Sequence, residues 1–221
     1  EDGEMRADVE MAAKIIEDRA LKTRQFFNTI AEHWDTLSRE VLGGFDLAGA
    51  VCGMMPEGCE AAVDLGCGTG IVLERMRGRA RQIIGVDGSP RMLELSRRRL
   101  AGVEGEPEGV SLRIGELSHL PLRDCEADFA SINMVLHHLS NTENALAEIR
   151  RVLRPGGLLV VADFDRHTQE RMRLDYGDLW LGFDEATMSR LLQAASFEVV
   201  STARHLVEQG LALNLTLARR L

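Results

Sequence analysis

The feature that most constrains the fold of this chain is an alternation of short apolar runs with amphipathic segments through its middle. The apolar runs occupy residues 61–65, 82–86, 110–114, 127–132 and 158–164. Runs that are apolar at consecutive positions are typical of strands buried on both faces of a parallel sheet. Because helical segments lie between the runs, the order predicts a doubly wound α/β sheet.

Capping patterns indicate where several helices begin. Ser89 precedes a proline, a pair that predicts an N-cap and a first helical residue. Ser140 and Glu143 have the spacing of a capping box, so a helix is expected to begin at Ser140 and to end at residues 154–157. Asp184 is predicted to cap a later helix.

The two ends of the chain differ from its middle. Residues 197–206 and 211–221 predict two strands that form an antiparallel pair at one side of the sheet. Residues 4–56 read as helical, and an apolar stripe recurs there at three- and four-residue steps. The stripe consists of Met5, Val9, Ala12, Ile16 and Ala20. We therefore divide the chain into an N-terminal helical extension or lid, residues 1–56, and a ligand-binding domain, residues 57–221.

Composition excludes several classes of function. The 221 residues carry a formal net charge of -9, from 26 Lys and Arg against 35 Asp and Glu. A protein that binds a phosphate backbone needs a basic face, so we expect no nucleic-acid partner for this domain. The four cysteines contain no C-x-x-C pair, and no apolar run reaches the length of a membrane helix. We expect a cytoplasmic protein with no membrane partner.

The strongest local signal is the segment VDLGCGTG at residues 63–70, which follows the first predicted strand and opens a helix. Its glycines permit a sharp turn and a close approach of ligand to backbone. The dinucleotide fingerprint needs a small residue at Ile71 or Leu73, and a phosphate loop needs Gly-Lys-Ser/Thr, so both motifs are excluded. The loop predicts a nucleoside ligand without a pyrophosphate; the alternative is a tight turn that binds nothing.

Asp87 ends the second predicted strand, about twenty residues beyond the glycine loop. An acid at this position can accept hydrogen bonds from both hydroxyls of a ribose. The alternative is an exposed turn aspartate before Ser89. The combination of this acid with the loop favours the nucleoside site.

Five motifs follow one another between residues 63 and 164: DLGCGTG, GVDGSPRMLELS, GELSHLPL, ADFASINMVLHHL and RVLRPGGLLVVADF. In order and spacing they resemble class I S-adenosylmethionine-dependent methyltransferases, of the type 11 group related to ubiquinone and menaquinone biosynthesis. The resemblance implies a Rossmann-like, doubly wound, seven-stranded sheet with an antiparallel last strand. It also implies S-adenosyl-L-methionine as the cofactor.

The same resemblance implies a set of cofactor-binding residues. They are Asp64, Gly66, Cys67, Gly68, Gly70, Asp87, Gly88, Met92, Glu116, Leu117 and Asn133. In that arrangement Asp64 and the loop glycines lie against the methionine part, and Asp87 holds the ribose. Glu116 would meet the adenine amino group, although the commoner residue there is Asp. Cys67 also suits plain packing within the loop.

Two further stretches resemble narrower groups. FFNTIAEHWD, residues 26–35, resembles the entry helix of the ubiquinone and menaquinone group, with Trp34 where Tyr is usual. RMRLDYGDLWLGF, residues 171–183, resembles methyltransferase domains fused to ArsR-type regulators. The long N-terminal helix would then match the linker from such a regulator.

The acceptor side is less defined by the sequence. Methyl transfer rests mainly on positioning and desolvation, and a base is needed only if the acceptor must lose a proton. His137 and His167 follow the fourth and fifth predicted strands and are the candidate catalytic residues. Substrate or lid roles are predicted for Phe27, Trp34, His138 and Trp180. Packing is the alternative for each of them.

Two other clusters are given structural roles. Asp163, Asp165 and His167 alternate at a strand end, but no second cluster supports a metal site, so none is assigned. The basic residues 97–99 fall on a helix face, where a solvated surface is expected.

We therefore predict an enzyme that transfers a methyl group to a small-molecule acceptor. The alternative is a non-catalytic S-adenosylmethionine-sensing domain of a transcriptional regulator. A nicotinamide-dependent oxidoreductase is disfavoured by Ile71 and Leu73. The apolar stripe of the N-terminal helix must be buried somewhere, which makes a homodimer through that helix a further hypothesis.

Overall fold

The computed structural model describes residues 2–101 and 109–221, with side chains from Met11 onward apart from residues 12, 13 and 15–17. Its α-helices are α1 Asp2–Ile30, α2 Trp34–Leu42, α3 Leu47–Gly53, α4 Ile71–Met76, α5 Pro90–Ala101, α6 Thr142–Val152, α7 Arg171–Asp175 and α8 Glu185–Ala194. Its strands are β1 Cys59–Leu65, β2 Ala80–Asp87, β3 Val110–Ile114, β4 Ala127–Asn133, β5 Leu153–Phe164, β6 Phe197–Leu206 and β7 Ala212–Arg220. Short 3-10 helices are η1 Ala31–His33, η2 Leu136–His138 and η3 Glu208–Gly210.

The strands form one seven-stranded sheet in the order β3-β2-β1-β4-β5-β7-β6. Strands β1 to β5 are mutually parallel, and β7 runs antiparallel to both β5 and β6. This confirms the predicted doubly wound sheet with an antiparallel last strand. Chain order reverses between β1 and β4, and ligands of such sheets bind at that switch point, beyond the carboxyl ends of the strands.

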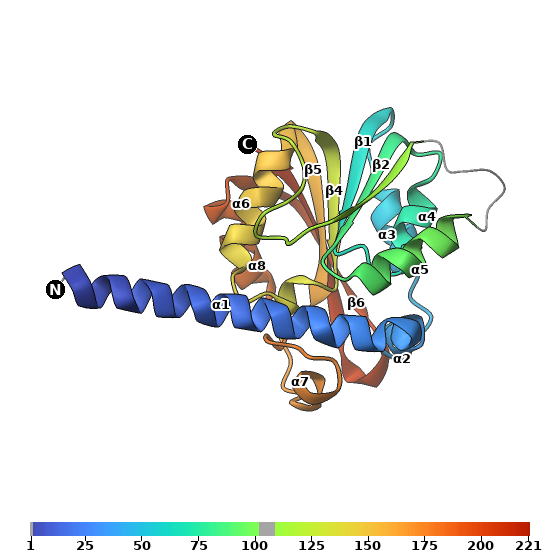
Figure 1. The fold of residues 1–221 in the computed structure, drawn as a ribbon. Helices are drawn as coiled ribbons and strands as arrows, with labels where there is room; N and C mark the ends of the chain where they lie inside the picture. Colours follow the sequence, from blue (N-terminus) through green and yellow to red (C-terminus); the bar gives the residue numbers. More distant parts are fainter. Residues whose placement is uncertain (1, 102–108) are drawn as a thin grey trace.

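Both faces of the central sheet are buried. In β1 every residue except Glu60 is buried, and neighbouring residues alternate between two clusters. Val63 and Leu65 pack with residues of α6 and α8, whereas Ala62 packs with residues of α3, α4 and α5. Figure 1 shows these two helical layers on opposite faces of the sheet. The two-sided burial explains why the parallel strands read as continuous apolar runs.

The predicted helical region is confirmed, but it has three parts with different surroundings. Helix α1 lies across the edge of the sheet at which the parallel strands end, and its N-terminal end extends beyond the body of the domain (Figure 1). Helix α2 follows it, and the chain then turns at Gly43. Helix α3 packs into the core with α4. Within the described residues, no helix combines enough length and apolarity to cross a bilayer. The division at residue 56 stays a prediction.

Two predicted helix starts are confirmed and one is wrong. Ser89 Oγ accepts a hydrogen bond from Met92 N (3.1 Å), and Asp184 Oδ1 accepts one from Thr187 N (2.7 Å). Helix α6, however, is capped by Asn141 in place of Ser140, through a hydrogen bond from Asn144 N to Asn141 Oδ1 (2.9 Å). Asn is as strong an N-cap as Ser, so the sequence pattern placed the cap one residue early.

The start of β5 is also earlier than predicted. The strand begins at Leu153, directly after α6, and not at residue 158. A register irregularity between Ala127 and Phe129 of β4 accommodates residues 154–157. Leu153 is buried in the core, which fixes this early entry into the sheet.

The substitution Asn141→Ala should lower the free energy of unfolding by about 1 kcal/mol, because it removes the hydrogen bond that caps α6. Urea denaturation without ligand measures this. Ser140→Ala is the matched control and should change stability by less than about 0.5 kcal/mol. A larger loss for Ser140→Ala than for Asn141→Ala would contradict the observed cap.

Candidate active site

A cavity of about 550 Å³ opens at the switch point, between the carboxyl ends of the parallel strands and helices α1 and α2. Its size is in the range of small-molecule sites. Most of the site residues predicted from the sequence line it: Asp64, Gly66, Cys67, Gly68, Asp87, Gly88, Met92, Glu116, Leu117, Asn133, Phe27, Trp34 and His138. The predicted residues outside its lining are Gly70, His137, His167 and Trp180.

The glycine loop needs its three glycines for different reasons. All three have positive φ, a backbone conformation that side chains rarely adopt. A methyl group on Gly66 would lie 2.6 Å from Val135 Cγ2, and one on Gly70 would lie 2.4 Å from Ser96 Oγ. A methyl group on Gly68 would meet nothing closer than Trp34 Nε1, at 3.7 Å. Gly66 and Gly70 therefore permit packing, whereas Gly68 leaves its backbone open to the cavity.

Asp87 holds the glycine loop to the start of α5. Its Oδ2 accepts a hydrogen bond from Gly68 N (2.8 Å), and its Oδ1 accepts one from Ser89 N (2.8 Å). Burial raises the pKa of Asp87, and the two amide donors oppose that change. Each carboxylate oxygen keeps a further lone pair for a ligand hydroxyl.

Asp64 and Asn133 form a second polar group, at the ends of β1 and β4. Asp64 is 2% exposed, and its Oδ1 accepts hydrogen bonds from Ser131 Oγ (2.6 Å) and Asn133 Nδ2 (2.9 Å). Burial raises the pKa of Asp64 to about 7 despite these donors. Asn133 Oδ1 is buried and has no hydrogen-bond partner among the described residues. The pair thus offers acceptors to a cationic donor on a ligand.

Glu116 follows β3 and faces the opposite end of the cavity. Its carboxylate pairs with Arg24 Nη1 of α1 at 3.2 Å, and both side chains are partly exposed. A methyl group on Gly88 would lie 3.6 Å from Glu116 Oε1, so this acid stands beside the end of β2. Met92 lines the same end and is buried.

Helices α1 and α2 are fastened over the cavity by polar contacts. Asp35 Oδ1 accepts a hydrogen bond from Thr69 Oγ1 (2.5 Å), and the same carboxylate pairs with Arg99. Asn28 Oδ1 accepts one from Ser89 Oγ (2.6 Å). These bonds connect the helices to the glycine loop and to α5.

A row of rings forms the wall beside the glycine loop. Phe27 packs edge-on against Trp34, with ring centroids 5.3 Å apart, and against His138 at 4.9 Å. Burial and the neighbouring His137 hold the pKa of His138 well below its usual value, so this imidazole is neutral at pH 7. The wall combines apolar surface with one neutral polar ring.

The remaining predicted residues lie beside the cavity and not in it. His137 is 2% exposed, and its Nδ1 is 2.8 Å from Asp163 Oδ1. His167 accepts a hydrogen bond from Gln169 N on Nδ1 (3.3 Å). Trp180 is 46% exposed, and its indole N–H donates to Leu139 O (2.8 Å).

The other loop residues fill space. Gly70 is the N-cap residue before α4 and lies against Ser96 of α5. Cys67 is buried in the core cluster, and burial raises the pKa of its thiol well above the usual value. A protonated, buried thiol packs as a small apolar side chain. This environment agrees with the alternative that Cys67 serves packing within the loop.

Sequence reasoning missed several contacts of the site. Asp35 belongs to the FFNTIAEHWD stretch, but its partners cannot be read from local spacing. Arg99 was expected on a solvated face; it is half-buried and pairs with Asp35, so that expectation is wrong for this residue. Arg24 and Asn28 carry no local signal, because their contacts depend on how α1 crosses the sheet.

Comparison with known proteins bears on this geometry. A family model described as "Methyltransferase domain" matches residues 63–161. A demethylmenaquinone methyltransferase of Desulfitobacterium hafniense (strain Y51) is 30% identical over 174 residues, which cover 76% of this chain and 67% of that protein. An uncharacterised 37.1 kDa protein in transposon TN4556 of Streptomyces fradiae is 39% identical over 123 residues, covering 54% of this chain and 34% of that protein.

Solved structures share the fold. The [4+2]-cyclase SpnF superposes with a TM-score of 0.75 at 18% identity, covering 89% of this chain and 94% of that one. The 1,6-didemethyltoxoflavin-N1-methyltransferase of Burkholderia thailandensis, solved with 1,6-didemethyltoxoflavin and S-adenosylhomocysteine bound, gives a TM-score of 0.72 at 22% identity. It covers 92% of this chain and 89% of its own.

The chain therefore belongs to the class I S-adenosylmethionine-dependent methyltransferases, and S-adenosylmethionine is its cofactor. The residues that line the cavity have the chemistry that S-adenosylmethionine requires. The unpartnered Asn133 Oδ1 and the Asp64 carboxylate are acceptors for an ammonium, and the open backbone at Gly68 admits a ligand. Asp87 offers lone pairs to the two ribose hydroxyls.

The substitution Asp35→Asn should weaken binding of S-adenosylhomocysteine by about fivefold or more, because it removes the charged bond that fastens α2 to the glycine loop. Calorimetry measures the affinity, and limited trypsin digestion should cleave α1 and α2 faster in the variant. Glu40→Gln, at an exposed carboxylate of the same helix, is the control. Equal affinities of Asp35→Asn and Glu40→Gln would contradict the fastening role.

Proposed function

We propose that this chain transfers the methyl group of S-adenosylmethionine to a small-molecule acceptor that binds beneath α1 and α2. One observation carries the proposal: the cofactor-binding carboxylates and the ring wall with His138 line the same cavity. A domain that only sensed the cofactor would need no adjoining space for a second molecule. The named activities of the Desulfitobacterium and Burkholderia relatives support a small acceptor.

The residues of the chain act mainly by positioning. When bound, S-adenosylmethionine supplies a methyl group on a sulfonium, which is a good leaving group. Asp64 and Asn133 hold the amino-acid end, and Asp87 holds the ribose. Phe27 and Trp34 exclude water, which favours a reaction whose positive charge disperses in the transition state.

We assign the polar contact with the acceptor to His138 in place of His137 and His167. His138 lines the cavity, whereas the other two histidines do not. Its Nε2 has no hydrogen-bond partner among the described side chains. A neutral imidazole at this place orients a hydroxyl or amine of the acceptor.

A screen of methyl acceptors tests the proposal. Candidate phenols, quinols, carboxylic acids and N-heterocycles are incubated with the protein and S-adenosylmethionine, and release of S-adenosylhomocysteine is followed. We expect turnover on at least one class, and none with Asp87→Ala, which loses the ribose contact. Tight cofactor binding without turnover on any class would favour the sensing domain of a regulator instead.

The affinity for S-adenosylhomocysteine should rise with pH between about 5.5 and 7.5. The pKa of Asp64 in the ligand-free protein is raised to about 7, and only its ionised form pairs with the ligand ammonium. Below that pKa, the affinity falls up to about tenfold per pH unit. Calorimetry across this range measures the effect. Asp64→Asn should bind more weakly with a flatter profile, and an unchanged slope in that variant would assign the titration to another group.

Three further expectations remain predictions. They are a homodimer through α1, the absence of a nucleic-acid partner for this domain, and a cytoplasmic location. The relation to ArsR-type regulators is also a prediction.

A further inference from the structure

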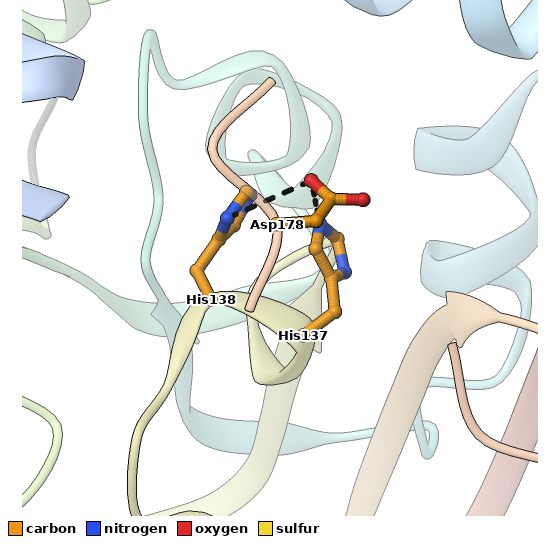
Figure 2. A group of neighbouring side chains, drawn as sticks. All are labelled: His137, His138 and Asp178. Atoms are coloured by element: carbon orange, nitrogen blue, oxygen red, sulfur yellow. Dashed lines mark ion pairs between the residues drawn. The ribbon is translucent and has the colours of Figure 1, made fainter. Parts of the chain in front are cut away.

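A second, much smaller cavity of about 20 Å³ lies beside the active-site cavity. Side chains of α2, η2, α7 and the segment after α7 line it, among them His137, His138 and Asp178. A space of this size holds about one water molecule or one ion. Figure 2 shows the two imidazoles converging on one oxygen of Asp178.

The Asp178 carboxylate lies close to both imidazoles but too far from them for direct hydrogen bonds. Asp178 Oδ1 lies 3.6 Å from His137 Nε2 and 3.8 Å from His138 Nδ1. The three ligand atoms are all within 4.8 Å of one another. His138 Nδ1–H donates a hydrogen bond to the carbonyl oxygen of Gly177 (3.2 Å), so an ion that binds Nδ1 would move the ring hydrogen to Nε2. Separations of 3.6 and 3.8 Å are expected when several ligand atoms surround one bound ion.

The carboxylate of Asp178 is buried without a hydrogen-bond donor. Its side chain is 0% exposed, and neither carboxylate oxygen has a hydrogen-bond partner among the described residues. A buried carboxylate without donors is strongly disfavoured unless a cation neutralises it.

His137 is oriented in the way that metal ligands usually are. Its Nδ1–H donates to Asp163 Oδ1 (2.8 Å), and Asp163 is in turn held by the amide N–H of Phe164 (2.8 Å). This turns Nε2 toward Asp178 Oδ1, at 3.6 Å. A carboxylate that fixes the far nitrogen of an imidazole is the common outer shell of a metal-bound histidine.

We propose that His137 Nε2, His138 Nδ1 and the Asp178 carboxylate bind a divalent transition-metal ion, with the carbonyl of Gly177 as an adjacent oxygen donor. Two imidazoles with oxygen ligands suit Zn²⁺ and its first-row neighbours. Tetrahedral bonds of about 2.1 Å place ligand atoms roughly 3.4 Å apart. The separations of 3.6 and 3.8 Å between Asp178 and the two imidazoles need only small side-chain movements to reach that geometry, with the hydrogen bond from His138 to Gly177 given up.

The ion would tie η2, which follows β4, to the segment after α7. With Nδ1 of His138 bound to the metal, Nε2 carries the ring hydrogen and is a donor to the acceptor. This consequence rests on the proposed function, whereas the metal site itself does not. The site is therefore a structural clamp on the ring wall, placed outside the cofactor contacts.

The test uses the full chain without a histidine tag. Metal content is measured on the purified protein, and the protein is then stripped with EDTA and titrated with Zn²⁺ by calorimetry and with Co²⁺ by visible absorption. We expect one ion per chain, a Co²⁺ spectrum of a four- or five-coordinate site, and a higher Tm with Zn²⁺. Asp178→Asn and His137→Gln should each weaken Zn²⁺ binding by about tenfold or more.

His167→Gln is the matched control, because His167 is a partly buried histidine near the site but outside the donor set. It should bind Zn²⁺ like the parent chain. If the parent chain binds no stoichiometric Zn²⁺ or Co²⁺, or if Asp178→Asn binds as well as the parent, the cavity holds a water molecule or a proton and the proposal is overturned. If Asp178→Asn does not fold, the parent titrations and His138→Gln test the site instead. Zn²⁺ binding by His138→Gln as tight as that of the parent chain would then overturn the proposal.

The two proposals fail separately. Binding of S-adenosylhomocysteine to the metal-free protein is measured in the same series. Loss of metal binding with intact cofactor binding and turnover would reject only the metal site. Stoichiometric metal binding without turnover on any acceptor would reject only the methyl transfer.

Discussion

The site depends on the two hydrogen bonds that the Asp87 carboxylate accepts from Gly68 N and Ser89 N. These bonds join the glycine loop after β1 to the helix start after β2, which are separate turns of the chain. Further hydrogen bonds from Gly66 N and Cys67 N to Val86 O hold the start of the same loop against the end of β2. Asp87 thus shapes the loop by accepting two amide hydrogen bonds, and its carboxylate keeps lone pairs that are available to a ligand hydroxyl.

The helices over the cavity use the same anchor points. Asn28 accepts from the hydroxyl of Ser89, the residue that also caps α5, and Asp35 accepts from Thr69 within the glycine loop. The helices over the cavity and the glycine loop are therefore connected through shared residues. On the opposite side, the Glu116 carboxylate, which the family resemblance assigns to adenine, is paired with Arg24 of α1.

The parts of the structure that local patterns govern were predictable from the sequence. Burial on both faces makes parallel strands apolar, and the strand ends carry residues with few alternatives, so local patterns pointed to Asp64 and Asp87, which line the cavity. The capping residue of α6 was missed because Ser140 and Asn141 are equally good caps, and only packing decides between them. The partners of Asp35 and Asp178 lie far away in sequence. No spacing rule indicates that Arg99 faces Asp35 or that Asp178 lies between His137 and His138.

Helix α1 is uninterrupted from Asp2 to Ile30, so it is about 43 Å long at 1.5 Å per residue. Its side-chain anchors at Arg24 and Asn28 are near one end. The longer part of the helix therefore extends from these anchors beyond the body of the domain (Figure 1). A tilt of about 5° at Asn28 displaces the far end by roughly 3 Å, because displacement grows with arm length. A small change of helix angle at the pocket would therefore be larger at the far end of α1.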